Sequence, residues 1–412
     1  MRFFIILFVS LTATTTWAAD WLAWRGPTGD NHARPVESVP TIWSDGENVL
    51  WKMPIPGFGH ATPIVVGQRI FLSTSDVTKN VQAVIAFDRQ TGKQEGLIVI
   101  HQGGLPAAIH AKNTHASPTM ACDGHQLYVI YVNNSAVWAT ALSVNGQKVW
   151  QQRVAGFDPK KYQFGYGASP TIYKDTLIIA CEYDGPDSGL YALDLKTGKQ
   201  RWKTERPRQI SFSSPIVTNI AGKDQLLISG FRQIASYDPS KGNSLWQATA
   251  TTDATCGTMV WDGDLVFASG GYPDSGTFAV RADGSKQVVW ENGVKCYEQS
   301  MLAVNGFVYG FADSGVAYCW RAGDGQEMWK QRLKGPVSAS PLLVGDNIFA
   351  TNELGTTYVF KANPKRFDSI SENQFGNSSF ASPVAVDNRI YLRHAIGDGA
   401  QRQEYLICVG SR

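Results

Sequence analysis

The chain of 412 residues carries a formal net charge of +2, with 43% hydrophobic and 17% charged residues. This composition is that of a globular protein, and the near-neutral charge without a basic run excludes the electrostatic footprint of a nucleic-acid-binding surface. It also argues against charge-driven attachment to a membrane. The 40 glycines, 13 tryptophans and 15 tyrosines favour many short strands joined by turns.

The first residues have the pattern of an export signal. Arg2 precedes an apolar run over residues 3–13 that is too short to span a bilayer, and residues 16–18 resemble a cleavage site. We therefore predict a signal peptide over residues 1–18 and a secreted or periplasmic protein. The first cysteine is Cys122 and no later apolar run could span a membrane, so we expect neither a lipid nor a membrane anchor.

Six cysteines stand at positions 122, 181, 256, 296, 319 and 408. An even number in an exported protein is compatible with disulfides, but the spacings are irregular and a core of this size needs no cross-links. We expect most of the cysteines to be free, buried thiols. No CxxC pair occurs, which excludes a zinc ribbon or a thioredoxin-like motif.

The most informative feature is a repeated tripeptide, Ala/Ser-Ser/Thr-Pro, followed by a β-rich run. It occurs at residues 61–63, 116–118, 168–170, 213–215, 339–341 and 381–383, with degenerate copies at 257–259 and 299–301. The third residue of each copy defines an anchor, at positions 63, 118, 170, 215, 259, 301, 341 and 383. Eight copies at this spacing suit eight four-stranded blades.

Each copy continues as strand, glycine turn and strand, and then leads through a second turn to a tryptophan. Residues 192–202 (ALDLKTGKQRW) show this most clearly. Gly198 takes the positive φ of the turn, Asp194 accepts hydrogen bonds from turn amides, and Trp202 packs against the neighbouring blade. We predict the same structural docking role for Trp51, Trp150, Asp238, Trp246, Trp290 and Trp329.

The eighth copy ends at residues 406–408 without room for a fourth strand. Residues 49–53 (VLWKM) stand before the first anchor and supply the missing strand, which would close the ring and remove two exposed edges. We therefore predict an all-β protein: a single eight-bladed β-propeller of four-stranded antiparallel blades over residues 49–412. Residues 19–48 form an N-terminal extension that packs on it.

These repeats resemble the quinoprotein-like propellers, built from pyrroloquinoline quinone (PQQ) enzyme repeats. Residues 192–202 match every position of that family's Ala-x-Asp-x-x-Thr-Gly-x-x-x-Trp pattern. Residues 21–31 (WLAWRGPTGDN) and 317–333 (AYCWRAGDGQEMWKQRL) resemble a secreted branch common in planctomycete-type bacteria. The resemblance covers nearly the whole mature chain and implies the propeller fold.

Two relatives implied by the resemblance differ in function. The quinone-dependent alcohol and sugar dehydrogenases carry an adjacent Cys-Cys pair, calcium ligands and a catalytic Asp, and this sequence has no Cys-Cys pair. The outer-membrane-assembly lipoprotein is a non-enzymatic scaffold with a lipidated cysteine, which this sequence also lacks. The fold therefore carries over, whereas PQQ with calcium as cofactor has no support from motifs.

The loops that enter each innermost strand share one face of a propeller with the loops that join second and third strands, and pockets form there around the axis. The residue three before each anchor should line this mouth: His60, His115, Gly167, Phe212, Cys256, Glu298, Ser338 and Phe380. Loops of the same face add Lys112, Asn113, Tyr166, Glu182, Asp184, Arg208, Arg232, Tyr272, Lys295, Tyr297, Asp313, Glu353 and His394. We expect the ligand-binding residues among these.

Several candidates also have a purely structural interpretation. The two histidines suit ligand or metal binding, and they equally suit solvated loop positions. Glu298 beside Lys295 is compatible with a surface ion pair, and the tyrosines at 166 and 272 with packing between loops. Cys256 lies across the predicted ring from the histidines, too far to pair with either as a nucleophile. We assign no metal ligand and no catalytic residue.

No catalytic motif is complete, since GxSxG, HExxH, P-loop and GxGxxG patterns are all absent. We therefore predict a monomeric, non-catalytic binding or scaffold propeller that engages an envelope protein or an envelope glycan through its axial face. The alternative is an enzyme at the same mouth, either a quinone-dependent dehydrogenase or a carbohydrate-active lyase or hydrolase. The dehydrogenase requires a tryptophan at the cavity floor, and none is expected there.

Overall fold

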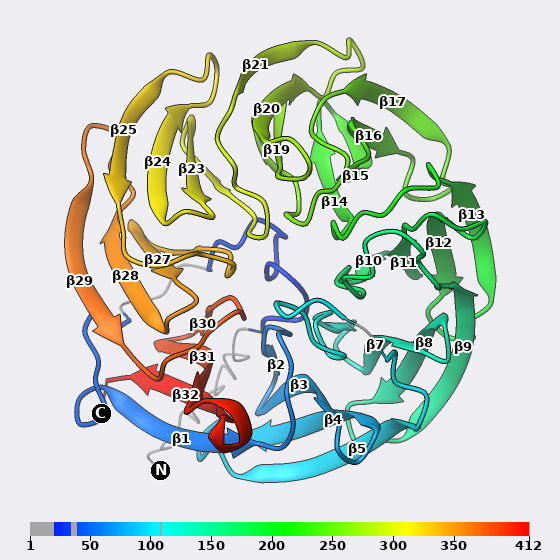
Figure 1. The fold of residues 1–412 in the computed structure, drawn as a ribbon, viewed down its shortest axis with the longest axis vertical. Helices are drawn as coiled ribbons and strands as arrows, with labels where there is room; N and C mark the ends of the chain where they lie inside the picture. The colour runs from blue at the N-terminus through cyan, green and yellow to red at the C-terminus, as the bar shows by residue number, and fades with distance from the viewer. Residues whose placement is uncertain (1–19, 34–38, 108, 412) are drawn as a thin grey trace, which may run out of the picture.

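The computed structural model describes residues 20–33, 39–107 and 109–411, so the predicted signal peptide lies outside the described residues. The described residues form eight four-stranded antiparallel sheets, arranged as blades around a central axis (Figure 1). This confirms the predicted all-β fold with eight blades. The only helix in the described part of the chain is the short 3-10 helix η1 (Gly399–Gln401), and none there is long and apolar enough to cross a membrane.

The blades follow one another in chain order, and within each blade the first strand is innermost. Blade 1 contains β2 (Ile64–Val66), β3 (Arg69–Asp76), β4 (Val81–Asp88) and β5 (Gln94–Gln102); blade 2 contains β6 (Ala121–Cys122), β7 (Gln126–Asn133), β8 (Ala136–Ser143) and β9 (Lys148–Gly156); blade 3 contains β10 (Thr171–Tyr173), β11 (Thr176–Cys181), β12 (Gly189–Asp194) and β13 (Gln200–Glu205); blade 4 contains β14 (Ile216–Ile220), β15 (Lys223–Gly230), β16 (Gln233–Tyr237) and β17 (Ser244–Thr249).

The second half of the ring has the same plan. Blade 5 contains β18 (Val260–Asp262), β19 (Leu265–Gly270), β20 (Gly276–Arg281) and β21 (Val288–Asn292); blade 6 contains β22 (Leu302–Val304), β23 (Phe307–Ala312), β24 (Val316–Arg321) and β25 (Glu327–Arg332); blade 7 contains β26 (Leu342–Val344), β27 (Asn347–Thr351), β28 (Thr356–Lys361) and β29 (Asp368–Gln374); blade 8 contains β30 (Val384–Val386), β31 (Arg389–Ile396), β32 (Gln403–Gly410) and β1 (Val49–Ile55).

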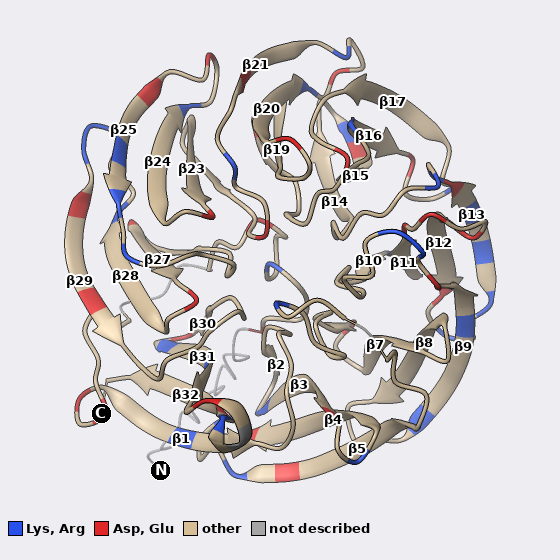
Figure 2. Cartoon of the chain, in the orientation of Figure 1, with Lys and Arg blue, Asp and Glu red and all other residues tan. Residues whose placement is uncertain are grey.

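The middle strands of each blade are buried because neighbouring blades cover both of their faces. In blade 3 all six residues of β11 are buried, whereas the outer strand β13 alternates between exposed and half-buried residues. A strand covered on both faces needs a continuous apolar run, which is how this segment reads in the sequence. Figure 2 shows that acidic and basic side chains are interspersed around the outer strands.

The N-terminal strand closes the ring, as predicted. β1 pairs antiparallel with β32, with Met53 opposite Leu406, so blade 8 has the strand order β1-β32-β31-β30. A buried ion pair within this blade holds Arg393, which also contacts the first blade. Arg393 Nη2 lies 2.6 Å from Glu404 Oε2, and Arg393 Nη1 donates a hydrogen bond of 2.9 Å to the carbonyl of Ser73 in blade 1.

The predicted docking tryptophans stand on the outermost strands of six of the eight blades, and four of them pack on a glycine turn of the next blade. Trp150 of blade 2 donates from Nε1 to the carbonyl of Leu195 in blade 3 at 2.8 Å, and a Cβ added to Gly198 would lie 2.7 Å from its ring. Asp194 accepts the backbone N–H of Thr197 at 2.8 Å and so holds the turn that the tryptophan covers. The same tryptophan-on-glycine contact recurs where Trp51, Trp202 and Trp290 meet Gly92, Gly242 and Gly325.

All six cysteines are free thiols, five of them buried and Cys256 half-buried. The buried thiols at positions 122, 181, 296, 319 and 408 belong to five different hydrophobic clusters of the core. They are therefore too far apart to pair, and they act as small apolar core residues.

A belt of hydroxyl groups joins neighbouring blades close to the axis. At six of the eight blade junctions, the residue before the anchor accepts a hydrogen bond from the backbone N–H of its counterpart in the preceding blade. The pairs are Thr62–Thr119 (2.9 Å), Thr119–Ser169 (3.0 Å), Ser169–Ser214 (2.8 Å), Thr258–Ser300 (2.9 Å), Ser300–Ser340 (2.9 Å) and Ser340–Ser382 (2.9 Å). This hydroxyl belt explains why the repeated tripeptide carries Ser or Thr before its third residue.

The belt corrects the predicted register of blade 2. Thr119, and not Ser117, occupies the belt position, and β6 begins at Ala121. The anchor of this blade is therefore Met120 rather than Pro118. The tripeptide Ala-Ser-Pro at residues 116–118 matches the repeat but lies two residues before the true anchor. The correct register has a sequence signal, because a methionine also follows the belt hydroxyl in blades 5 and 6. The mouth position, three residues before the anchor, is Ser117 and not His115.

Residues 20–33 cross the central channel. The segment starts with a β-bridge between Trp21 and Val65 in blade 1, and Leu22 accepts the N–H of Cys122 in blade 2 at 2.8 Å. It ends in blade 7, where Asn31 accepts the N–H of Leu343 at 3.0 Å. Figure 1 shows this dark blue segment inside the ring. The N-terminal extension thus spans the channel from one side to the other.

Candidate functional site

One residue from every blade lines a cavity of about 580 Å³ on the propeller axis, here called the axial cavity. In blade order the mouth residues are His60, Ser117, Gly167, Phe212, Cys256, Glu298, Ser338 and Phe380. Seven of these are the residues that the repeat spacing selects, and Ser117 replaces His115 because of the corrected register. A volume of this size is within the usual range of small-molecule sites, roughly 300–1,000 Å³.

Trp24 closes the axial cavity from within the channel. It donates from Nε1 to Thr258 Oγ1 at 2.8 Å, which places it at the depth of the hydroxyl belt, and it lines the cavity. The expectation that no tryptophan would stand at the floor was wrong. The sequence gives no signal for this position, because the course of residues 20–33 depends on contacts with blades that are distant in sequence.

Lys112 reaches across the mouth to the opposite blades. It lies on the long connection between blades 1 and 2, and its Nζ is 2.7 Å from Glu353 Oε1 and 3.4 Å from Glu298 Oε2. Ser338 donates towards both carboxylates, at 2.6 Å for Glu353. Burial alone would lower the pKa of Lys112, but the two carboxylates raise it, so the ammonium stays charged. Glu298 therefore pairs with Lys112 and not, as considered above, with its neighbour Lys295.

A second charged pair lies beside the first. Lys295 Nζ is 3.4 Å from Asp313 Oδ2, and Asp313 Oδ1 accepts the backbone N–H of Tyr297 at 2.9 Å. Burial raises the pKa of Asp313. Burial also raises the pKa values of the Tyr297 hydroxyl and the Cys256 thiol, so both stay protonated at neutral pH.

Aromatic rings form the rest of the wall. His60 stacks on Phe380 with ring centroids 4.4 Å apart and an interplanar angle of 12°. Phe164 stacks on Phe212 at 6.1 Å and 28°. Burial, assisted by the positive charges of Arg393 and Arg402, lowers the pKa of His60 to about 3. The imidazole is consequently neutral at physiological pH and acts as a flat ring rather than as a charge.

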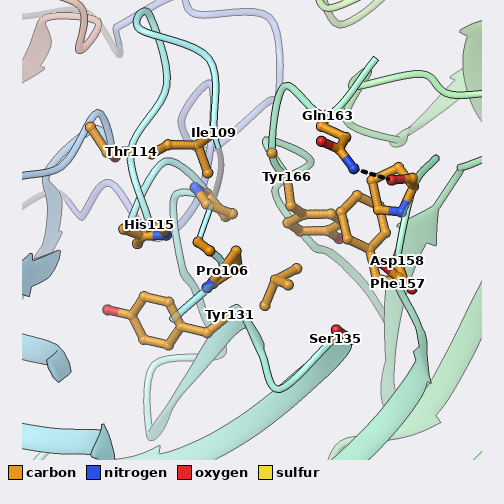
Figure 3. A pocket seen from close by; sticks show the side chains of 15 residues that line it. Pro106, Ile109, Thr114, His115, Tyr131, Ser135, Phe157, Asp158, Gln163 and Tyr166 are labelled. Carbon is orange, nitrogen blue, oxygen red and sulfur yellow. Dashed lines mark hydrogen bonds between the residues drawn. The ribbon is translucent and has the colours of Figure 1, made fainter. Parts of the chain in front are cut away.

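A second cavity of about 310 Å³ lies between the two longest blade connections (Figure 3). Tyr131, Phe157 and Tyr166 surround it, with His115 and Asp158 on opposite sides in this view. Burial lowers the pKa of His115. The wall between the cavities is shared: residues 109 and 165 face the second cavity, and residues 110 and 164 line the axial one.

The remaining candidates divide between the cavity and other places. Lys112, Asn113, Tyr272, Lys295, Tyr297 and Glu298 line the axial cavity, and Glu353 contacts it through Lys112. Three others belong to the core. Tyr166 packs edge-on against Phe157, the Glu182 carboxylate forms a buried ion pair of 2.5 Å with Arg206, and His394 is buried within β31. Their positions at strand ends suggested exposure at the mouth, and covering by neighbouring blades prevents it.

Three polar candidates lie away from the axial cavity. Asp184 accepts two backbone N–H groups of the connection over residues 158–166, at 3.0 and 2.8 Å. Arg232 pairs with two aspartates at 2.6 and 2.9 Å, and Arg208 is exposed. Sequence reasoning in turn missed Trp24, Ser117 and Phe164, of which only Ser117 had a signal, in the methionine that follows the belt hydroxyl.

Within the described ranges, no group of three or more His, Cys, Asp and Glu side chains is arranged to hold a metal ion. Glu298 and Glu353 are both engaged by Lys112, and Asp313 is engaged by Lys295. A calcium ion takes six to eight oxygen ligands from carboxylates, carbonyls and waters, and the carboxylates here are already paired with lysines. The donor set of the axial cavity therefore does not fit a calcium-bound quinone.

The fold and its axial cavity define a PQQ-like repeat propeller. A family model described as outer membrane protein assembly factor BamB matches residues 14–162, 140–331 and 288–400, which together span nearly the whole chain. The chain belongs to this family. No curated protein sequence matches it.

Solved structures show the same architecture at low sequence identity. BamB from Moraxella catarrhalis is 12% identical with a TM-score of 0.61, over 87% of this chain and 96% of that one. The quinohemoprotein alcohol dehydrogenase from Comamonas testosteroni is 14% identical with a TM-score of 0.68, over 97% of this chain and 82% of that one. The computationally designed Ika8 protein is 11% identical with a TM-score of 0.58, over 85% and 98%. At these identities the likeness concerns the fold alone.

Proposed function

We propose that this protein is an exported, monomeric, non-catalytic binding propeller that holds its ligand in the axial cavity. The observation that carries the proposal is the convergence of one mouth residue from each of eight blades on a single cavity of about 580 Å³. Such a cavity, rigidly framed and lined by aromatic rings with a few polar groups, has the character of a small-molecule site.

The state of the reactive groups supports binding rather than catalysis. The pKa of His60 is about 3. At neutral pH the imidazole is therefore a weak base, and almost none of it is in the protonated form that could act as a general acid. The raised pKa of Cys256 keeps its sulfur as the thiol, which is a poor nucleophile. Lys112 Nζ is engaged by Glu353 and Lys295 Nζ by Asp313, so neither side chain is a free amine nucleophile.

The proposed location and partner class follow from the sequence pattern and the family. The predicted signal peptide and the family description, which names an outer-membrane assembly factor, support a place in the cell envelope. There the ligand would come from an envelope glycan or an envelope protein.

The alternative is an enzyme at the same cavity, and one observation favours it. Trp24 stands where a dehydrogenase of this fold needs a flat floor for a quinone. The charges of the cavity argue against a quinone-dependent dehydrogenase. Lys112 and Lys295, which would pair with the carboxylates of PQQ, already pair with carboxylates of the protein. A carbohydrate-active enzyme would use Glu298 and Glu353 as its pair of catalytic carboxylates, and both of them are bound to Lys112.

A thermal-shift titration of the mature protein tests the proposal. PQQ with Ca²⁺, a panel of envelope glycans and a panel of neutral oligosaccharides are added separately, because a ligand that binds only the native state raises the Tm. The solutions are then analysed for oxidised or cleaved products. We expect a Tm rise without any product. A rise with PQQ and Ca²⁺, or a product that disappears in a Glu298→Gln variant, would replace the proposal by the enzymatic alternative.

A further inference from the structure

We infer that the ligand of the axial cavity is a neutral saccharide; this rests on the proposed function. Three properties of the cavity lining point to this class of ligand: its charges, its hydroxyl groups and its flat rings.

The charges of the lining are already compensated inside the protein. Lys112 is shared between Glu298 and Glu353, and Lys295 pairs with Asp313. His60 is neutral because of its low pKa. A ligand with a net charge would have to break one of these pairs and leave its partner desolvated and unpaired, which is strongly unfavourable. The cavity therefore favours a ligand without net charge.

These paired groups still have hydrogen-bonding capacity. An ammonium group has three donors, of which Lys112 uses two, and a carboxylate has about four acceptor positions. Polar groups that are paired but not saturated can bind the adjacent hydroxyl groups of a neutral ligand without losing their ion pair.

The hydroxyl belt adds donors at the depth of the cavity. The buried hydroxyls of Thr119, Ser169, Ser214 and Ser382 line the cavity, and each accepts a backbone N–H from the neighbouring blade. In the described part of the chain, none of these four hydroxyls donates its own proton to a protein acceptor. A buried donor requires an acceptor, so an occupant that displaces water from this depth keeps the four hydroxyls satisfied only if it supplies oxygen atoms.

The flat rings complete the fit. Trp24 at the floor, the stacked His60–Phe380 pair and the Phe212 ring present apolar faces among these polar groups. A sugar ring has the matching character, with C–H groups on its faces and hydroxyls around its edge. A neutral, oxygen-rich ligand with apolar faces satisfies the lining as a whole, whereas an aliphatic or a charged ligand does not.

The experiment compares saccharides that differ in charge. Short malto-, cello-, xylo- and manno-oligosaccharides serve as neutral probes, oligogalacturonate as the anionic probe and chitosan oligomers as the cationic probe. Calorimetric titration of the mature wild-type protein should detect at least one neutral series and neither charged one. If a charged series bound and none of the neutral series did, the result would overturn the inference.

A variant reverses the charge balance. Lys112→Gln leaves Glu298 and Glu353 without their cation, so the affinity for chitosan oligomers should rise about tenfold. The affinity for neutral oligosaccharides should fall, because the ligand loses a hydrogen-bond donor of Lys112. Lys161→Gln removes an exposed lysine from the neighbouring connection and should change neither affinity. If both variants bound chitosan oligomers with the same affinity, the result would contradict the role assigned to Lys112 in neutralising Glu298 and Glu353.

The outcomes separate this inference from the proposed function. Binding of only a peptide or another non-saccharide in the cavity would refute the saccharide and leave the binding function standing. A neutral saccharide that binds and is cleaved would keep the ligand class and refute the non-catalytic function. If no probe bound to the cavity, the result would refute both the neutral-saccharide ligand and the proposed binding function.

Discussion

At the scale of single residues, burial keeps two histidines neutral that would be charged in the unfolded chain at mildly acidic pH. The pKa of His394 is lowered to about 4 by burial, and that of His60 to about 3. Both therefore bind a proton in the unfolded state before they do so in the native state. Between about pH 6.5 and their native pKa values, each fall in pH favours unfolding.

His394 allows this effect to be measured. It should remove roughly 3 kcal/mol of stability as the pH falls from 6.5 to about 4, since each pKa unit corresponds to about 1.4 kcal/mol. Urea unfolding of His394→Gln should depend less on pH in this window than the wild type does. His125→Gln, at an exposed histidine, serves as the control, and an identical pH dependence of all three proteins would contradict the prediction.

At the scale of elements, a tryptophan that covers a glycine turn attaches one blade to the next at four junctions, where the glycines are Gly92, Gly198, Gly242 and Gly325. Gly198 has φ +69° and lies against Trp150, so a side chain there meets both backbone strain and a clash. Gly263 has a similar φ of +58° but faces open space. The pair of glycines separates the effect of the contact from that of the backbone conformation.

Alanine substitutions exploit this difference. Gly198→Ala should lower the free energy of unfolding by about 2–4 kcal/mol, because overpacking is added to the left-handed conformation. Gly263→Ala should lower it by only about 1–2 kcal/mol. Urea denaturation of both variants gives the two values. If they were equal, the tryptophan contact would not contribute to joining the blades.

The sequence predicts elements better than it predicts the site because the repeat is local and the cavity is not. The repeated tripeptide and the tryptophan turns suffice for eight blades, and one of the eight anchors failed only because residues 116–118 imitate the motif two positions early. The spacing also selects seven of the mouth residues. Trp24 and the Lys112 pairs could not be found this way, because they join segments separated by up to 241 residues.

At the scale of the whole molecule, the axial cavity exists only when the ring is closed, because every blade contributes to its mouth. Closure depends on β1 pairing with β32 and on the buried Arg393, which contacts Glu404 in blade 8 and the Ser73 carbonyl in blade 1. Side chains of both partners in this ion pair are only 2% exposed. Removal of Arg393 would leave Glu404 buried with Arg402, 3.0 Å away, as its remaining cation.

Arg393→Met tests the closure. It should destabilise the protein by about 2–4 kcal/mol, because Glu404 loses its buried partner and the Ser73 carbonyl loses its donor, whereas Arg402 still compensates part of the Glu404 charge. Lys330→Met removes an exposed lysine of β25, 61% exposed in its side chain, and should change stability by less than about 1 kcal/mol. Thermal and urea unfolding of both variants provide the comparison, and similar values would show that the buried pair does not hold the ring.

The central claim, that the axial cavity is the ligand site, is tested most directly by filling it. Gly167 lines the cavity, and the nearest atoms to a Cβ built there are 3.9 Å away, so Gly167→Phe places a ring in the cavity without backbone strain. Gly293→Phe is the control at an exposed position with open space. Calorimetric titration with the oligosaccharide that binds best should show binding lost in Gly167→Phe and unchanged in Gly293→Phe. Wild-type affinity in a correctly folded Gly167→Phe protein would contradict the claim and place the ligand elsewhere.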